Sequence, residues 1–525
     1  MSGPSRLHGR GYGVGPGVQS SDWAACPLAW TDIRTFRRPH GVGFATVREM
    51  DAHDSVTELI GNTPLLRLRT SGEGREAAVY GKLEYLSVGG SVKDRIGLRM
   101  IEQAEREGLL KPGGTVVEAS SGNTGVGLAL VAATKGYRIV TVLSDRTSSE
   151  KVAALRAFGA EVVLKPAGVP RHHPEHPLGT AARIAGEIPG GWLAGQYDNP
   201  ANPEAHYLTT GPEIWRQTGG RITHLVSCIG TGGTISGTGR YLKEVSGGAV
   251  RVIGADPASS VYSGGDGRPY FVEAAGHWRH PETVEDLWPQ SYHQDVVDRV
   301  VPVADRDSLL TIRRLAREQG LLVGGSSGTA VAAARQVAAE AGPEAVVVVI
   351  LPDSGRQYLT KYFDDGWLLR LGFLDGDAAG VRVDDAVAAA AREQPLPYLN
   401  GRTTVADALA ALRERCAGGA PAVLPAGPCP VGPRRRPTAP ELAGSVALDE
   451  LTAAVESGRA APGDPVGDHL AAPLPRFGSG EPAEAALAEL TGRGLDTAVV
   501  LHDGHAIALI GPADLRGCLA AERPQ

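Results

Sequence analysis

Three short glycine-rich segments, each lying between an apolar run and a helical pattern, place the strongest constraint on the fold of this chain. A strand that enters a helix through glycines leaves backbone N–H groups and the positive end of the helix facing an anion. One such segment alone is more often a structural turn, but several in order favour a ligand site at the carboxyl ends of strands. The apolar runs and the glycine segments that follow them are 115–118 with 120–125, 224–229 with 230–234, and 321–323 with 324–328.

The sequence around these segments alternates short apolar runs with helical periodicity. Strands that alternate with helices of ten or more residues predict an α/β fold with parallel sheets covered on both faces. The other predicted strands are 139–143, 161–164, 250–255 and 346–351, and the predicted helices are 94–107, 123–135, 148–158, 235–245, 308–319 and 329–341.

A lysine precedes the three segments, in the run Gly89-Gly90-Ser91-Val92-Lys93-Asp94-Arg95. Lys93 is one of eight lysines and lies at the start of the predicted helix 94–107. A partly desolvated amine at that position can form a Schiff base with an aldehyde cofactor. An isolated lysine at a helix start is usually solvent-exposed, but the three glycine-rich segments that follow Lys93 favour the cofactor site.

These segments together resemble the fold-type II enzymes that use pyridoxal phosphate (PLP), in particular the family of cystathionine β-synthase and cysteine synthase. The resemblance runs from about residue 54 to 374, and the extra C-terminal region favours the cystathionine synthase side. It implies a tryptophan synthase β-like fold with two doubly wound parallel-sheet subdomains. Further segments that carry it are 58–65 (ELIGNTPL), 196–200 (QYDNP), 206–214 (HYLTTGPEI) and 351–361 (LPDSGRQYLTK).

The resemblance also implies roles for individual residues. Lys93 is expected to hold PLP as a Schiff base and then to act as the general base at Cα. Asn123 is expected to bond the ring hydroxyl, and Ser326 to face the pyridine nitrogen. Tyr197 is expected either to line the cleft near the incoming nucleophile or to pack in the core. The expected phosphate cradle is Gly230, Thr231, Gly232, Gly233 and Thr234, and the expected grip on the substrate carboxylate is Ser120, Ser121, Thr124 and Gln196.

The reaction that the resemblance implies is β-replacement on L-serine, or on an activated serine, through an aminoacrylate. Homocysteine as the nucleophile gives cystathionine. A cysteine synthase that uses sulfide, or an enzyme of specialised metabolism with another nucleophile such as an amine, is the alternative. A non-catalytic PLP or adenosyl sensor is a third hypothesis. A nicotinamide dehydrogenase is disfavoured because no GxGxxG follows the first strand with an acidic residue ~20 positions on.

The sequence departs from the family in the loop expected to cover the second substrate. The family pattern resembles Glu-Gly-x-Gly-x-Asp-x-x-Pro, whereas this chain has EAAG at 273–276 and EDLWP at 285–289. The two pieces fit the pattern if residues 277–284 are an insertion, which either changes the nucleophile or is a surface bulge. Ser120 also replaces a threonine of the family pattern, which removes a methyl group beside the substrate.

Length and composition set the remaining expectations. A chain of 525 residues forms more than one domain. We expect a disordered extension at 1–52, the catalytic domain at 53–374, a linker with a first degenerate CBS-type domain at 375–440, and a second one at 441–525. Ser445 and Asp449 resemble an adenosyl-binding pair, whereas Pro512 replaces the hydroxyl residue of the second copy. A structural or dimerising appendage is the alternative.

Charge and cysteine usage indicate the partners and the compartment. The net charge of −7 provides no basic surface for nucleic acid, and no apolar run reaches the ~20 residues of a membrane span. The five cysteines lack metal or disulfide spacing, which favours free thiols in the cytoplasm. The family resemblance implies amino acid and thiol substrates, and a homodimer or larger homo-oligomer. No metal is expected at His172, His173 and His176, and a haem at Cys26 is disfavoured. The family-like sequence begins directly after Met50, a candidate start.

Overall fold

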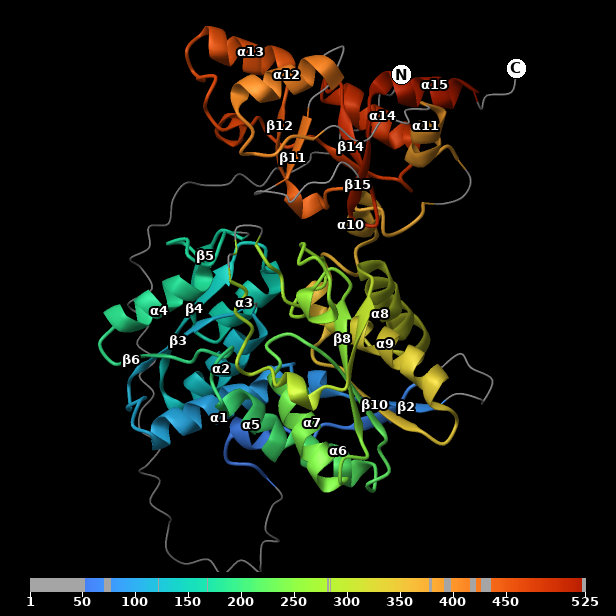
Figure 1. Ribbon diagram of the computed structural model, residues 1–525. Coiled ribbons are helices and arrows are strands. Elements are labelled where there is room, and N and C mark those ends of the chain that lie inside the picture. The colour runs from blue at the N-terminus through green and yellow to red at the C-terminus, as the bar shows by residue number, and fades with distance from the viewer. Residues whose placement is uncertain are drawn as a thin grey trace, which may run out of the picture. The chain divides into compact units, whose positions relative to one another are not determined.

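The computed structural model describes residues 52–69, 77–120, 122–167, 169–280, 283, 285–376, 380–390, 398–415, 422–425 and 436–521. Residues His53–Gln525 belong to one unit, and all elements described below lie within it. Their arrangement is drawn in Figure 1.

The larger sheet has the strand order β1-β2-β10-β7-β8-β9, and every neighbouring pair except β1 with β2 is parallel. Helices cover both of its faces (Figure 1). The strands are β1 (Leu65–Arg67), β2 (Ala78–Lys82), β7 (His224–Cys228), β8 (Arg251–Pro257), β9 (Arg299–Val303) and β10 (Val346–Ile350), and the helices are α6 (Thr210–Gln217), α7 (Gly233–Val245), α8 (Asp305–Gln319), α9 (Gly325–Ala341) and α10 (Asp365–Arg370).

Strand β10 explains why this sheet is covered twice. Val347 and Val349 pack into a core cluster with residues of α8 and α9, whereas Val348 and Ile350 pack into another with residues of α6 and α7. Successive side chains of a strand point to opposite faces, so an uninterrupted apolar run requires an apolar layer on each side.

The smaller sheet has the order β5-β4-β3-β6 and is parallel throughout. Val116 packs toward α1, α2 and α5, and Val117 packs toward α4. The strands are β3 (Thr115–Ala119), β4 (Arg138–Ser144), β5 (Glu161–Lys165) and β6 (Gly191–Leu193), and the helices are α1 (Lys93–Arg106), α2 (Asn123–Lys135), α3 (Ser149–Ala157), α4 (Pro177–Glu187) and α5 (Ala201–Leu208).

Two further clusters of strand and helix follow residue 374. One core spans 399–470 and includes α12, α13 and β12, and the other joins α11 to the elements after residue 476. Strand β11 lies before residue 440 in the sequence and strand β12 after it, and the two form an antiparallel pair. The elements are α11 (Val383–Ala389), α12 (Val405–Arg415), β11 (Ala422–Pro425), β12 (Leu442–Val446), α13 (Leu448–Glu456), β13 (Arg476–Gly478), α14 (Ala483–Gly492), β14 (Ala498–His502), β15 (His505–Ile510) and α15 (Pro512–Ala521).

The predicted α/β fold with two parallel sheets is confirmed, but one predicted strand is wrong. Residues 321–323 form no strand, and Val323 makes only an isolated bridge to Ser354. The chain enters α9 at Gly325, two residues later, so this apolar segment lies beside the turn after β10 and does not extend a sheet.

Candidate active site

The turn before α1 fixes the position of Lys93. Gly90 has a φ of +84°, a left-handed conformation that favours glycine. The carboxylate of Asp94 accepts a hydrogen bond from the Gly89 N–H at 2.6 Å, and the Val92 N–H donates to the Pro352 carbonyl at 2.7 Å. Lys93 is therefore the first residue of α1, held beside the turn that follows β10.

The electrostatic surroundings of Lys93 suit a nucleophilic amine. The side chain is half-buried, and desolvation lowers the pKa of its ammonium group to about 8, against the opposing charge of Asp353. A lysine with such a pKa has a substantial fraction of free amine near neutral pH, which is the reactive form.

Close packing of α1 on α2 places Lys93 near Asn123. A Cβ at Gly127 would lie 2.6 Å from the Lys93 carbonyl oxygen, and a Cβ at Gly97 would lie 2.7 Å from the Gly127 carbonyl carbon. Real Cβ atoms do not approach backbone atoms so closely, so the two glycines allow the helices to touch backbone to backbone. Asn123 is the first residue of α2, and its spacing from Lys93 depends on this contact.

We expect Gly127→Ala to displace Lys93. The added methyl group meets backbone that has no free volume, so the unfolding free energy should fall by about 1–3 kcal/mol and PLP should bind more weakly. Urea unfolding and a PLP titration of the apoenzyme measure the two effects. Gly179→Ala on α4 is the matched control, because its Cβ would meet nothing within 4 Å. Equal behaviour of the two variants would contradict the packing argument.

Asn123 and Ser326 carry buried polar atoms that lack partners. The amide Nδ2 of Asn123 donates to Asp353 Oδ2 at 2.7 Å, while its Oδ1 has no hydrogen-bond partner among the described residues. Ser326, on the first turn of α9, is 2% exposed, and its Oγ likewise has no partner in the described part of the chain. Buried polar atoms are nearly always hydrogen-bonded, so these two oxygens fit polar groups of a bound ligand.

The segment 230–234 forms a cradle at the start of α7. Gly232 has a φ of +87°, and a Cβ at Gly233 would lie 1.9 Å from Asn202 Oδ1. The loop backbone therefore follows a path that side chains would block, and Gly230 precedes it at the end of β7. The first N–H groups of a helix attract an anion such as phosphate.

The two threonines of this cradle are held by one neighbouring helix, α5. Asn202 Nδ2 donates to Thr231 Oγ1 at 3.1 Å, and Thr234 Oγ1 lies 3.2 Å from His206 Nε2. Burial, with the charge of Lys93, lowers the pKa of His206 well below its usual range, so this histidine is neutral. It positions Thr234 without adding a charge.

The segment before α2 brings together most of the residues predicted to grip a carboxylate. Ser120 Oγ accepts hydrogen bonds from the Gly122 and Gly125 N–H groups at 3.0 and 3.3 Å, so its oxygen caps the turn while its proton stays available. Thr124 Oγ1 donates to Gln196 Oε1 at 2.5 Å. Ser121 lies outside the described residues.

Tyr197 follows Gln196 on the far side of this loop and is half-buried. Its carbonyl accepts a hydrogen bond from the Ser291 N–H at 2.9 Å, and the Ser291 hydroxyl donates to the Gln196 carbonyl at 3.2 Å. The segment 196–199 is thus held between α2 and the segment that ends at residue 292.

Glu118 lies beneath this segment as a buried acid that the sequence analysis did not single out. It is 1% exposed, and its Oε2 accepts a hydrogen bond from the Gln196 N–H at 3.4 Å. Desolvation raises the pKa of its carboxyl to about 8, although hydrogen bonds from Gln196 and Gly195 oppose the shift. The group is therefore mainly protonated at neutral pH.

This shift gives stability a pH dependence that Glu118→Gln should remove. Because the folded pKa of about 8 exceeds the reference value of 4.5, the native state holds the extra proton between these values, and stability falls as pH rises through them. The slope should approach about 1.4 kcal/mol per pH unit. Urea midpoints from pH 5 to 8 should decline less for Glu118→Gln. The surface variant Glu105→Gln should keep the wild-type slope, and an unchanged slope in Glu118→Gln would contradict the assignment.

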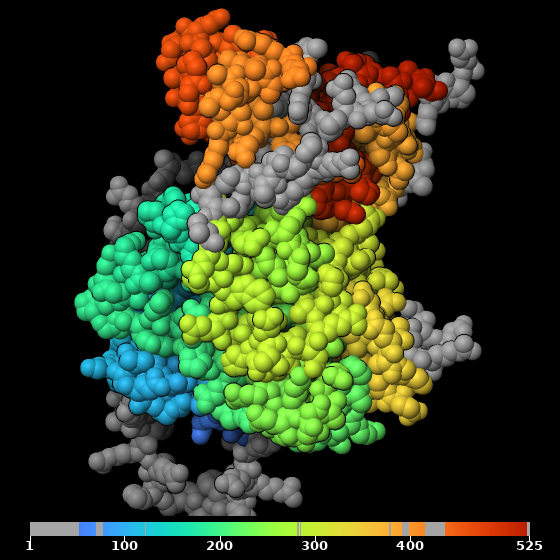
Figure 2. All heavy atoms as spheres, in the orientation of Figure 1, coloured from blue at the N-terminus to red at the C-terminus, as the bar shows by residue number. Residues whose placement is uncertain are grey.

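The loop 273–292 packs against the phosphate-type cradle. A Cβ at Gly230 would lie 2.8 Å from the Ala274 carbonyl oxygen, and the Tyr262 hydroxyl donates to the Gly230 carbonyl at 3.0 Å. His277 Nε2 lies 2.7 Å from Asp286 Oδ1, so a hydrogen bond joins the first residue of the proposed insertion to a residue just beyond its end. Residues 281, 282 and 284 of the insertion lie outside the described residues. Figure 2 shows yellow-green atoms from this part of the chain on the visible face.

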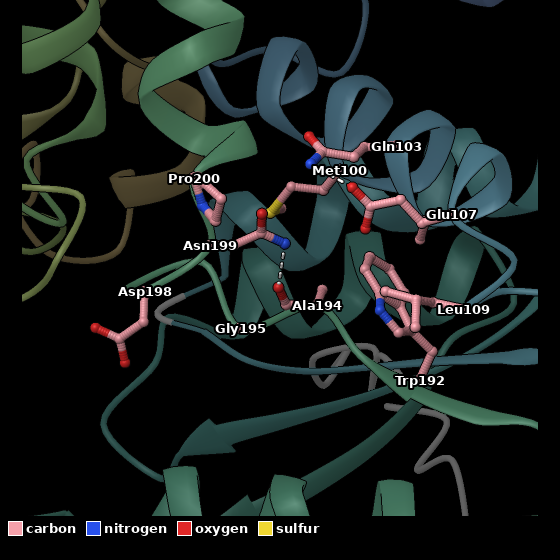
Figure 3. A pocket seen from close by; sticks show the side chains of 11 residues that line it. Met100, Gln103, Glu107, Leu109, Trp192, Ala194, Gly195, Asp198, Asn199 and Pro200 are labelled. Atoms are coloured by element: carbon pink, nitrogen blue, oxygen red, sulfur yellow. Dashed lines mark hydrogen bonds between the residues drawn. The ribbon is translucent and has the colours of Figure 1, made fainter.

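A separate pocket of about 340 Å³ lies on the α1 side of the segment 192–200 (Figure 3). Met100, Trp192 and Asn199 are among its lining residues, and Asn199 Nδ2 donates to the Ala194 carbonyl at 2.8 Å. None of the predicted site residues lines this pocket. It is distinct from the group of residues around Lys93.

Three residues that were not predicted from the sequence contact the predicted site. Asp353, Asn202 and His206 all lie in or beside segments that carried the family resemblance, and those segments were the available signal. Among the described residues, no group of three or more His, Cys, Asp and Glu side chains is arranged to hold a metal ion.

Comparison with known proteins places this arrangement in a family. Residues 56–353 match the family described as "Pyridoxal-phosphate dependent enzyme". The chain is 39% identical over 427 residues to cystathionine β-synthase of Oryctolagus cuniculus, which covers 78% of this chain and 73% of that protein. The chain belongs to the cystathionine β-synthase family of PLP-dependent enzymes. Membership confirms the predicted fold class, the enzyme prediction and the cofactor.

Other relatives differ in how much of their length is shared. Cystathionine β-synthase of Apis mellifera is 42% identical over 322 residues, and the match spans 60% of this chain and 62% of that protein. The crystal structure of an O-acetylserine dependent cystathionine β-synthase from Helicobacter pylori has a TM-score of 0.54 and 34% identity, covering 59% of this chain and 99% of that chain. The likeness therefore spans nearly all of that chain.

Proposed function

We propose that this chain catalyses β-replacement on L-serine, or on an activated serine, and joins it to homocysteine to form cystathionine. The observation that carries the proposal is the pairing of a desolvated Lys93 with unpartnered buried atoms of Asn123 and Ser326, in a chain of this family. Cysteine synthesis from sulfide, or reaction with another nucleophile, is the alternative that loop 273–292 keeps open.

The donor set fits PLP. Ser326 Oγ offers a neutral partner for a pyridine nitrogen, and Asn123 retains an N–H and a carbonyl oxygen for a ring hydroxyl. The glycine-rich cradle at α7 with Thr231 and Thr234 suits a phosphate, because it joins backbone N–H groups to hydroxyl donors. Bound PLP supplies an electron sink for the bond that breaks at Cα. A neutral hydroxyl at Ser326 does not force the ring nitrogen to stay protonated, which favours elimination over transamination.

In this proposal Lys93 both holds the cofactor and moves protons. As a free amine it takes the Cα proton of the substrate, and as an ammonium it returns a proton to the departing hydroxyl group. The lowered pKa of about 8 suits both directions, because the free and protonated forms then coexist near neutral pH.

The substrate carboxylate is proposed to lie at the first turn of α2. There the helix N-terminus and the Ser120 proton are available to a carboxylate, and Gln196 accepts the Thr124 proton and so holds Thr124 beside them. Ser121 is proposed as a further contact on the sequence alone. Tyr197 is proposed to border the path of the incoming nucleophile, because its backbone is bonded to the loop 273–292.

Product analysis tests this function. The purified enzyme with PLP is incubated with L-serine and homocysteine, and in parallel with O-acetylserine and sulfide, phosphoserine, or amine nucleophiles. Mass spectrometry should detect cystathionine in the first mixture. Product only from an activated serine or another nucleophile would overturn the homocysteine assignment and make residues 277–284 the first segment to delete.

The region after residue 374 is proposed to be a degenerate pair of CBS-type domains. Two cores, each built of short strands and helices, support this proposal, although Ser445 Oγ already donates to the Ala472 carbonyl at 2.8 Å.

We also propose a homodimer in the cytoplasm. The described cysteines, Cys228 and Cys518, are buried and form no disulfide, in keeping with a reducing compartment. In the part of the chain that the structure describes, every helix is too short or too polar to cross a bilayer.

A further inference from the structure

A buried lysine joins the halves of the catalytic domain built on the two sheets. Lys151 lies on α3, beside the smaller sheet, and its side chain is 0% exposed. Its Nζ donates to the Tyr358 hydroxyl at 2.8 Å and forms an ion pair with Glu273 Oε2 at 3.0 Å. Tyr358 follows β10 of the larger sheet, and Glu273 begins the loop 273–292.

One branch of this network ends on Asn123. The Tyr358 hydroxyl donates to Asp353 Oδ2 at 2.5 Å, and Asn123 Nδ2 donates to the same oxygen at 2.7 Å. An oxygen that accepts both bonds fixes which end of the Asn123 amide faces it. The remaining N–H and the unpartnered Oδ1 of Asn123 are thereby fixed as well. Asp353 is also the carboxylate whose charge acts on Lys93.

The other branch holds the loop 273–292. Glu273 Oε1 forms a second ion pair with Lys361 Nζ at 2.8 Å, and the Glu273 N–H donates to the Tyr362 hydroxyl at 2.8 Å. Burial raises the pKa of the Glu273 carboxyl, but Lys151 and Lys361 outweigh it and bring the pKa below its usual value. Glu273 is therefore charged and anchored where the loop begins.

The aliphatic part of Lys151 makes a third contact. A Cβ at Gly122 would lie 2.6 Å from Lys151 Cδ, so the turn that carries Ser120 and Thr124 rests on this side chain. Burying an ammonium group costs several kcal/mol unless it is paired. An apolar side chain of similar size would fill this space without that cost. A buried lysine here therefore indicates that its directed contacts with Tyr358 and Glu273 are needed, and not only its packing.

We propose that Lys151 is a positioning residue for the reaction: through Tyr358 and Asp353 it fixes the amide of Asn123 at the cofactor ring, and through Glu273 it seats the loop 273–292. One buried ammonium group thus links the ring contact to the loop over the second substrate. The loop's role toward a thiol substrate rests on the proposed function, whereas the link to Asn123 rests only on PLP binding.

Single-atom variants separate the two branches. Tyr358→Phe removes one hydroxyl and keeps the ring stacked on Tyr362 at 4.7 Å. We expect the dissociation constant of PLP to rise roughly tenfold, the pH titration of the bound cofactor's visible absorption to shift, and the KM for homocysteine to stay near the wild-type value. Glu273→Gln should show the reverse pattern, with the KM for homocysteine raised and the absorption unchanged. Lys151→Met should show both effects.

Surface counterparts serve as matched controls. Lys135→Met and Tyr137→Phe remove the same groups from a partly exposed contact with Glu105, and both should keep the wild-type absorption and PLP affinity. Wild-type absorption and affinity in Tyr358→Phe would overturn the proposal, as would equal effects of Tyr358→Phe and Glu273→Gln on the cofactor. If Lys151→Met does not fold, the other two variants still decide.

The cofactor measurements also separate this inference from the proposed function. PLP affinity and absorption are measured without any nucleophile. If the wild-type enzyme forms no cystathionine but Tyr358→Phe shifts the absorption as expected, the homocysteine assignment fails and the positioning role of Lys151 stands.

Discussion

Lys93→Ala should abolish turnover while leaving the fold intact. Loss of the general base alone lowers a rate about 10²–10⁴-fold, and loss of the covalent attachment of PLP adds to this. The side chain is only half-buried, and its amine donates no hydrogen bond to a described residue, so truncation leaves the packing of α1 unchanged. Steady-state product formation and the visible absorption of bound PLP measure the two losses.

Chemical rescue separates this role from a structural one. A small primary amine added to Lys93→Ala should restore part of the proton transfer, because it can occupy the space of the missing side chain. Lys243→Ala is the matched control, since Lys243 pairs with Asp298 at the surface and lies away from the site. Retained activity in Lys93→Ala, or equal losses in both variants, would contradict the assignment.

Arg95→Leu should cost about 3–5 kcal/mol of unfolding free energy, the usual result of leaving buried carboxylates without their cation. Arg95 is 3% exposed and donates to both oxygens of Glu84, at 2.7 and 2.8 Å. It also donates to both oxygens of Glu213, at 2.7 and 2.8 Å. The network joins α1 to α6 and to the end of β2, where Lys82 pairs with Glu213 at 2.6 Å.

Urea unfolding followed by tryptophan fluorescence measures this effect. Arg183→Leu is the matched control, because its ion pair with Glu187 is exposed and should contribute less than about 0.5 kcal/mol. Arg95→Lys should recover only part of the loss, because an ammonium group cannot match two carboxylates in a bidentate way. Similar midpoints for Arg95→Leu and Arg183→Leu would show that the network contributes little.

Burial raises the pKa of Glu213, but Arg95 and Lys82 outweigh it and hold this pKa at about 2. The network around Arg95 also separates the features of the fold that local sequence predicts from those that it does not. The glycine-rich turns and apolar runs of β3, β7 and β10 predict the parallel sheets, because those patterns are local. Strand β2 ends in Lys82, and a lysine in a local sequence predicts a surface position. In the structure Lys82 is buried and pairs with the carboxylate of Glu213, 131 positions further along the chain. No local pattern reports such a partner.

The site divides in the same way. Lys93 and the cradle at 230–234 are recognisable in sequence, because a lysine and glycines at strand-to-helix turns carry their chemistry locally. The bond between Asn123 and Asp353 joins residues 230 positions apart and depends on how the two halves pack. Ser120 was predicted to bind substrate, and the structure shows in addition that its oxygen caps the turn, which only the backbone geometry reveals.

The central claim is that Lys93 carries PLP, and reductive trapping tests it most directly. The PLP-loaded enzyme is treated with borohydride, digested, and analysed by mass spectrometry for the lysine that bears the reduced cofactor. We expect the label on Lys93, in the segment that follows Gly89 and Gly90. A label on Lys151 or on another of the eight lysines, with Lys93 unmodified, would show that Lys93 does not carry PLP.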